Sequence, residues 1–143
     1  MSECQLQYIM GFLEKIYERA RDAKKKILLS EASDERVIRA IKGILKLGVA
    51  VPVLIGGTEE ADRTAKKQGM DLKGFEIIDN RKSKDLDKYV ALYCEKRKHK
   101  NVSPDDALKI ITTNPVFYAA LMVASGDADG TVTGAATTTR DVA

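Results

Sequence analysis

The chain has 143 residues, of which 44% are hydrophobic and 31% charged, and its formal net charge is +3. These values are ordinary for one soluble globular domain with a core of its own. The charge is too small to indicate nucleic-acid binding, and no apolar run approaches the ~20 residues that a membrane-spanning helix needs.

The first part of the chain alternates helix and strand signals. Apolar residues at helical spacing predict an amphipathic helix over residues 5–23, and a short apolar run predicts a buried strand at residues 27–29. Ser33 is the predicted N-cap of the next helix, and Gly48 is its predicted stop. A helix, a strand and a second helix are thus expected before residue 50.

The middle of the chain continues this alternation. A strand is predicted at residues 51–55, where Pro52 must lie near the start or on an edge because proline cannot donate a ladder hydrogen bond. A Gly-Gly-Thr turn then leads into a helix over residues 59–68, and a third strand is predicted at residues 75–79. Apolar residues at helical spacing from 86 to 93 predict a helix that runs into a basic tract.

Two further helix starts are well signalled. Ser103 and Asn114 each precede a proline, which places a cap and then a proline at the first helical position. The last strand is predicted at residues 131–133. This alternation predicts a doubly wound, mostly parallel α/β sheet with helices on both faces, in three α/β/α layers. No linker interrupts residues 1–143, so we expect a single α/β domain.

The stretch most informative about function runs from Gly126 to Gly134, Gly-Asp-Ala-Asp-Gly-Thr-Val-Thr-Gly, and continues into two alanines and three threonines. Its glycines and small residues let the backbone approach a ligand closely. A helix that begins within the threonines would offer free N–H groups to an anion. The same glycines also suit an ordinary strand-to-helix turn, so both interpretations stay open.

Other classes of site are not supported. The glycines at 130 and 134 lack the spacing of a nicotinamide-binding fingerprint, and no P-loop is present. His99 has no Cys, Asp or Glu at metal-ligand spacing, so we predict no metal site. Asp127 and Asp129 would share a face of an extended segment, but turn chemistry explains both without an acid–base role.

The start of the chain and its cysteines bear on where the protein works. Residues 1–5 contain no basic segment that leads into an apolar one, so we expect no secretory signal. Cys4 and Cys94 form no CxxC pair and suggest no metal site. Two unpatterned cysteines are typical of a reducing compartment, which predicts a cytoplasmic protein.

The segment Gly-Asp-Ala-Asp-Gly-x-Val-x-Gly-Ala from residue 126 resembles the signature of phosphate acetyltransferases. Five other segments follow the order of that family: Phe-Leu-Glu-Lys-Ile from residue 12, Ser-Asp-Glu-Arg-Val from 33, Val-Leu-Ile-Gly from 53, Arg-Lys-His-Lys from 97 and Asn-Pro-Val-Phe-Tyr-Ala from 114. The resemblance therefore covers essentially the whole chain. Members are more than twice as long, which implies the amino-terminal portion of a two-domain enzyme. The implied fold is the first domain of the isocitrate/isopropylmalate dehydrogenase-like class.

The resemblance implies the reversible reaction of acetyl-CoA with phosphate to give acetyl phosphate and CoA. It implies no tightly bound cofactor, coenzyme A as a substrate, other small-molecule substrates, and a homodimer of the complete enzyme. The arginine of the family's Arg-Lys-His-Lys segment is associated with coenzyme A, which implies this role for Arg97 and, less strongly, for Lys98. The residues alone also allow solvated cations at a helix end.

Phosphate contacts are expected on the turn after the last strand and at the end of the first. The candidate residues are Ser33, Gly134, Thr137, Thr138, Thr139 and Arg140. Arg140 aligns poorly with the arginine that follows this turn in the family. The family's catalytic residues lie mainly in its later half, so they are expected beyond residue 143 and the chain alone is expected to be inactive.

Two alternatives to the acetyltransferase stay open. One is a phosphate butyryltransferase, since the acyl pocket cannot be sized from this part of the family. The other is a phosphotransacetylase-like domain without transferase activity, as malic enzymes carry, used for assembly or effector binding.

Overall fold

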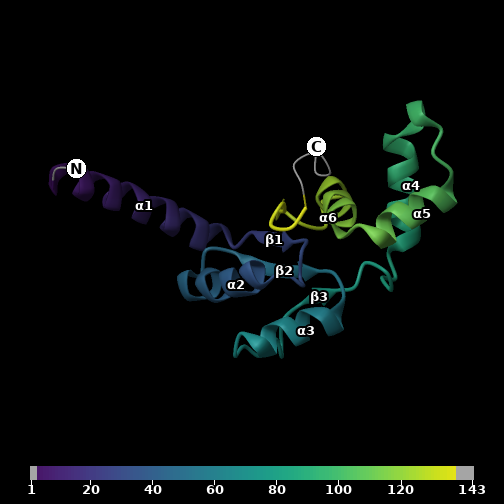
Figure 1. Cartoon of the computed structure of the whole chain (residues 1–143). Helices are drawn as coiled ribbons and strands as arrows, with labels where there is room; N and C mark the ends of the chain where they lie inside the picture. The colour runs from purple at the N-terminus through teal and green to yellow at the C-terminus, as the bar shows by residue number, and fades with distance from the viewer. Residues whose placement is uncertain (1–2, 138–143) are drawn as a thin grey trace.

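The structure, a computed structural model, describes residues 3–137 (Figure 1). Within these residues, the strands β1 (Lys26–Leu29), β2 (Val51–Ile55), β3 (Ile77–Ile78) and β4 (Gly130–Val132) form one sheet in the order β3-β2-β1-β4. All three pairings are parallel. The predicted parallel sheet is confirmed.

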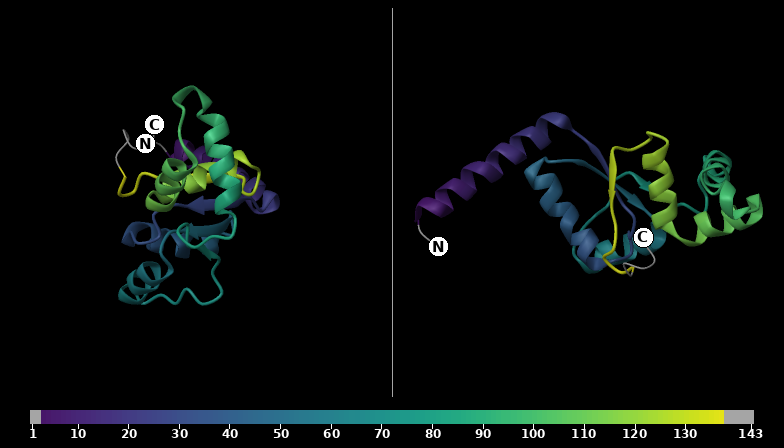
Figure 2. Two further views of the ribbon diagram at one scale, coloured as in Figure 1. Left: turned by 90° about the vertical axis from the view of Figure 1, so that its right-hand side faces the viewer. Right: turned by 90° about the horizontal axis from the view of Figure 1, so that it is seen from above.

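Helices cover both faces of this sheet, as Figure 2 shows. The helices α2 (Glu35–Leu47) and α3 (Thr58–Lys67) lie on one face. The helix α6 (Pro115–Ala124) lies on the other and contacts β2 and β4, while α4 (Leu86–Lys96) and α5 (Pro104–Thr113) pack against α6. The predicted three-layer, doubly wound arrangement is therefore confirmed.

Successive strand residues supply the two cores, because side chains alternate between the faces of a strand. Leu29 and Leu54 pack in a core with the buried residues of α2 and α3. Leu28 and Val53, their neighbours in sequence, pack in the opposite core with the buried residues of α4, α5 and α6. Both faces of the sheet are thus buried, and this explains why the strands read as continuous apolar runs.

The start of α2 differs from the prediction. Its N-cap is Asp34, whose Oδ1 accepts a 2.8 Å hydrogen bond from the Arg36 amide, and the prediction of Ser33 as the cap is wrong. A carboxylate at this position also gains from the helix dipole and from the Arg36 side chain. Gly48 ends the helix in the left-handed conformation with φ 65°, as predicted.

The two proline-marked helix starts are confirmed. The hydroxyl of Ser103 accepts from the Asp106 amide at 3.1 Å, and the side chain of Asn114 accepts from the Val116 amide at 2.9 Å.

Among the described residues no single helix is long and apolar enough to cross a membrane. Helices α5 and α6 pass that test only as a pair, and they meet at a bend of 109°.

The strand β3 is shorter than the predicted residues 75–79. The Phe75 amide bonds to the Leu72 carbonyl in a turn, and the Asp79 carboxylate folds back onto the Arg81 amide at 2.9 Å. Both ends of the predicted strand are therefore drawn into local turns. The short strand also explains Pro52, because β3 pairs with β2 only from Leu54 onward and leaves the start of β2 without a partner on that side.

The helix α1 (Glu3–Ala23) projects away from the sheet in both figures. The Nε of Arg21 donates to the Leu47 carbonyl at 2.8 Å and links the carboxyl end of α1 to α2. The predicted helix is confirmed, but its apolar side chains lie open: Phe12 is 59% exposed and Ile16 43%.

Candidate functional site

A cleft of about 300 Å³ lies at the carboxyl edge of the sheet. Ser30 follows β1, Gly56 follows β2 and Asn80 follows β3 along its wall, and Thr137 lines it after β4. From β1 the chain runs to β2 and β3, then returns to place β4 on the other side of β1. The cleft is thus beside a topological switch point, where open α/β sheets bind ligands.

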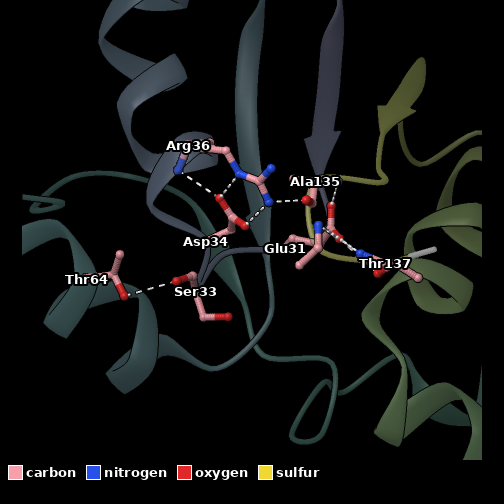
Figure 3. Close-up of polar contacts among 8 residues, drawn as sticks. Glu31, Ser33, Asp34, Arg36, Thr64, Ala135 and Thr137 are labelled. Atoms are coloured by element: carbon pink, nitrogen blue, oxygen red, sulfur yellow. Dashed lines mark hydrogen bonds and ion pairs between the residues drawn. The ribbon is translucent and has the colours of Figure 1, made fainter.

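The turn after β4 closes onto Glu31 (Figure 3). The Glu31 carboxylate accepts hydrogen bonds from the amides of Ala135 at 2.6 Å, Ala136 at 2.7 Å and Thr137 at 2.7 Å. The Thr137 hydroxyl donates a fourth, at 2.8 Å. Four donors from residues 135–137 therefore converge on one side chain, which is only 7% exposed.

The environment of Glu31 favours its ionised form. Burial raises the pKa of the carboxyl group, but the hydrogen bonds from Ala136, Ala135 and Thr137 together outweigh burial and hold the pKa below its usual value. The amides of residues 135–137 are thus taken by a carboxylate of the same chain. No helix has begun by Thr137, and Thr138, Thr139 and Arg140 lie outside the described residues.

Asp34 and Arg36 form the second tie to this turn. The guanidinium of Arg36 pairs with both oxygens of Asp34, through Nε at 3.1 Å and Nη2 at 2.7 Å, and Nη2 also donates to the Ala135 carbonyl. The hydrogen bond from Arg36 lowers the pKa of Asp34 to about 2. Ser33 lies between Glu31 and Asp34 and lines the cleft, while its carbonyl accepts from Thr64 at 3.2 Å.

On the opposite rim one guanidinium pairs with two carboxylates. Arg81 donates to Asp79 at 3.0 and 3.1 Å and to Glu60 at 3.4 Å, and the hydrogen bond from Arg81 lowers the pKa of Asp79.

Gly56 has φ 141°, and a Cβ there would lie 3.3 Å from the Ala32 Cβ, so glycine permits the close approach of the two strand ends. The Ser30 hydroxyl is buried and has no hydrogen-bond partner among the described residues.

Asn80 was not among the predicted site residues. It is 3% exposed, and its Nδ2 donates to the carbonyls of Ile111 and Thr112, both at 2.9 Å. Asn80 therefore fixes the end of α5 against the cleft. Neither Asn80 nor Glu31 carries a sequence signal of its own, because their partners lie 31 or more positions away.

The two aspartates of the Gly-rich stretch are structural anchors. Asp127 accepts from Lys88 at 2.5 Å and from Tyr89 at 2.7 Å, and Asp129 accepts from Lys25 at 2.7 Å and from the Lys26 amide at 2.8 Å. Turn chemistry alone does not account for them, since these partners come from α4 and the start of β1. Both aspartates position the approach to β4.

The predicted coenzyme A residues lie apart from the cleft. Arg97 caps the end of α4, with its Cζ 5.9 Å from the centroid of the Tyr93 ring, and Lys98 begins the 3-10 helix η1 (Lys98–Lys100). This end of α4 lies away from the sheet in Figure 1, and neither residue lines the cleft.

The described residues also hold no group of three or more His, Cys, Asp or Glu side chains that could bind a metal ion.

An open, doubly wound α/β sheet with a polar cleft at its switch point defines a class of small-molecule-binding domains. The model of the phosphate acetyl/butaryl transferase family matches residues 11–143, and the chain belongs to this family. The predicted family is thus confirmed.

Individual relatives agree with this assignment. The phosphate acetyltransferase of Thermoanaerobacterium thermosaccharolyticum is 38% identical over 133 residues, which are 93% of this chain and 40% of the relative. A phosphotransacetylase structure from Streptococcus pyogenes superposes with a TM-score of 0.84 at 30% identity, covering 99% of this chain and 41% of that one. The NADP-dependent malic enzyme of Escherichia coli is 31% identical over 126 residues, which are 86% of this chain and 17% of the enzyme. The chain thus spans about 40% of the length of the acetyltransferase it matches.

Proposed function

We propose that this chain is the first domain of a two-domain phosphate acetyltransferase, with residues 1–143 forming a single α/β domain. The complete enzyme transfers an acetyl group between coenzyme A and inorganic phosphate. The observation that carries the proposal is the cleft at the switch point, into which the family's signature segment delivers the turn after β4. Coenzyme A is a substrate here and no cofactor is tightly bound. The complete enzyme is a cytoplasmic homodimer.

The reaction places clear demands on the site. A phosphate oxygen attacks the acetyl carbonyl, the C–O bond forms, the C–S bond breaks and CoA leaves as a thiolate. The enzyme must hold the phosphate and stabilise the oxyanion of the tetrahedral intermediate. In this proposal Ser33 and Gly134 contact phosphate together with Thr138, Thr139 and Arg140, while Thr137 lines the cleft with its amide and hydroxyl donated to Glu31. The residues that stabilise the oxyanion belong to the second domain.

Arg97 and Lys98 bind the phosphates of coenzyme A in this proposal. No carboxylate among residues 11–137 pairs with either side chain, so both charges are available to a ligand. The Tyr93 ring supports the planar guanidinium of Arg97, and a guanidinium can bind a phosphate through two parallel hydrogen bonds. A second contact, away from the cleft, suits an extended ligand that reaches from the reacting thioester to its distant phosphates.

The two alternatives have less support. The malic enzyme shares less sequence with the chain than the acetyltransferase does, 31% against 38%. For the butyryltransferase, the segments from residues 97 and 126 resemble the acetyl branch more closely.

An assay of the complete enzyme tests the proposal. Thiol release from acetyl-CoA should depend on inorganic phosphate, acetyl phosphate should accumulate in equal amount, and butyryl-CoA should react more slowly. Equal or faster reaction of butyryl-CoA would support the butyryltransferase. Absence of phosphate-dependent release from either thioester would support the assembly or effector domain.

A further inference from the structure

Glu31 is a buried charged side chain that the proposed reaction does not use. Its carboxylate lies at the end of β1, yet all its hydrogen bonds described above come from residues 135–137, more than 100 positions away. Each of the four donor–acceptor distances is between 2.6 and 2.8 Å, the range of charge-assisted hydrogen bonds.

The arrangement is that of an anion-binding nest whose anion belongs to the protein. Successive backbone N–H groups that converge on one point bind phosphate or carboxylate groups in many proteins. Here the Glu31 carboxylate occupies that point. A substrate phosphate cannot use the same N–H groups while Glu31 does, because each N–H has one proton to donate.

Arg36 holds the other side of the same turn. Its guanidinium donates to the Ala135 carbonyl and is itself oriented by both oxygens of Asp34. The hydrogen bonds and charge of Asp34, and then the charge of Glu31, raise the pKa of Arg36. The β1–α2 connection therefore contacts both the N–H groups and a carbonyl of the turn after β4.

We infer that Glu31 is a positioning residue, whose carboxylate fills the nest of residues 135–137 and so sets the direction in which the chain leaves β4 for the cleft. The inference rests on the proposed function in one respect: that function assigns phosphate contacts to the residues that follow the nest. Phosphate binds beyond the nest, and Glu31 acts on it only through the placement of this turn.

Amide NMR of the chain tests the contact without any activity. The amide protons of Ala135, Ala136 and Thr137 should move together as Glu31 titrates in acid. They should lose that response in Glu31→Gln and keep it in Glu35→Gln, since Glu35 is an exposed carboxylate nearby in the chain whose hydrogen-bond partner among the described residues is Gln68. Inorganic phosphate should leave the three amides unchanged. Amides that do not respond to Glu31 would show that its carboxylate does not occupy the nest. Amides that phosphate shifts in the wild type would show that the nest is a ligand site. Either result would overturn the inference.

Kinetics of the complete enzyme test the consequence. Glu31→Gln should raise the KM for phosphate about tenfold or more, because it weakens charge-assisted hydrogen bonds that hold the turn. The KM for CoA should change little, and Glu31→Asp should recover part of the loss because it keeps the charge. A wild-type KM for phosphate in an active Glu31→Gln enzyme would overturn the inference. Loss of every phosphate-dependent activity from the wild type would count against the proposed function, while the NMR result would still decide the role of Glu31.

Discussion

The phenol of Tyr89 donates a 2.7 Å hydrogen bond to Oδ2 of Asp127, 38 positions further along the chain. The same oxygen accepts from Lys88 Nζ and from Ser125 Oγ, each at 2.5 Å. Burial, then the bond to Asp127, raises the pKa of Tyr89, and the bonds from Lys88, Ser125 and Tyr89 lower the pKa of Asp127. Helix α4 is thereby joined to the loop that delivers β4.

Removing the Tyr89 hydroxyl should destabilise the fold. Tyr89 is 2% exposed, so in Tyr89→Phe the Asp127 carboxylate loses a buried donor. We expect the free energy of unfolding to fall by about 1.5–3 kcal/mol, the usual value for a hydrogen bond to a charged group. Urea denaturation followed by circular dichroism measures this. The control is Tyr93→Phe, one turn on and also buried, whose hydroxyl has no hydrogen bond within the described residues. Equal effects of both substitutions would contradict the prediction.

Acid should weaken the connection between β1 and α2. The pKa of Asp34 is about 2 in the folded chain and about 3.9 for an unfolded aspartate. The stability that its ionised form contributes is therefore fully present well above the unfolded value and is lost as pH falls from about 4 to 2. In Asp34→Asn the urea midpoint should be lower at neutral pH and should drop less over that interval. The exposed Asp22→Asn serves as the control, and an unchanged slope in Asp34→Asn would disprove the assignment.

Arg97→Ala should weaken coenzyme A binding in the complete enzyme. The KM for CoA should rise while the KM for phosphate changes less, because Arg97 lies outside the cleft. Losing a charge-assisted phosphate contact costs about 1.5–3 kcal/mol in a shielded site and less in an open one. Steady-state kinetics with each substrate varied in turn give both constants, with Lys96→Ala as the neighbouring charge control. Unchanged CoA kinetics would leave Arg97 as a solvated cation at a helix end.

The 143-residue chain alone should not synthesise acetyl phosphate. The residues that stabilise the oxyanion belong, in the proposed function, to the second domain. A purified chain of verified mass, assayed with acetyl-CoA and phosphate, should release thiol no faster than the uncatalysed reaction. Turnover above that background would move the active site onto the cleft described here.

The isolated chain should associate through α1. Phe12 and Ile16 are large apolar side chains that lie 59% and 43% exposed, and exposed apolar patches promote association. Sedimentation velocity should show oligomers that Phe12→Ser with Ile16→Ser reduces, whereas Lys15→Ser does not. A wild-type monomer with high, cooperative thermal stability would refute this expectation.

The sequence by itself determined the elements whose signals are local. Ser103, Asn114 and Gly48 mark helix ends through contacts within four positions, so the residues that cause each boundary are adjacent in the chain. The apolar runs of β1 and β2 predicted strands because both faces of the sheet are buried. The ordered motifs then predicted the family, because their residues and their order can be read from the chain without knowledge of any tertiary contact.

Where two local signals competed, the sequence was less decisive. Ser33 and Asp34 are both good N-caps, and Asp34 is the cap because it also pairs with Arg36. Residues 75–79 read as one strand, yet the structure keeps only Ile77–Ile78, because Phe75 and Asp79 are held in turns. In each case the local propensities were similar, and a side-chain or turn contact determined which residue became the N-cap or how long the strand became.

Only the tertiary structure decided what meets at the cleft. The order β3-β2-β1-β4 brings the end of β1 beside the end of β4, and this alone lets Glu31 reach the amides of residues 135–137. The same return of the chain brings Asp127 to Tyr89. These contacts span from 38 to 106 positions, and they leave no periodicity or spacing in the sequence, because sheet order is fixed by the packing of helices on two faces.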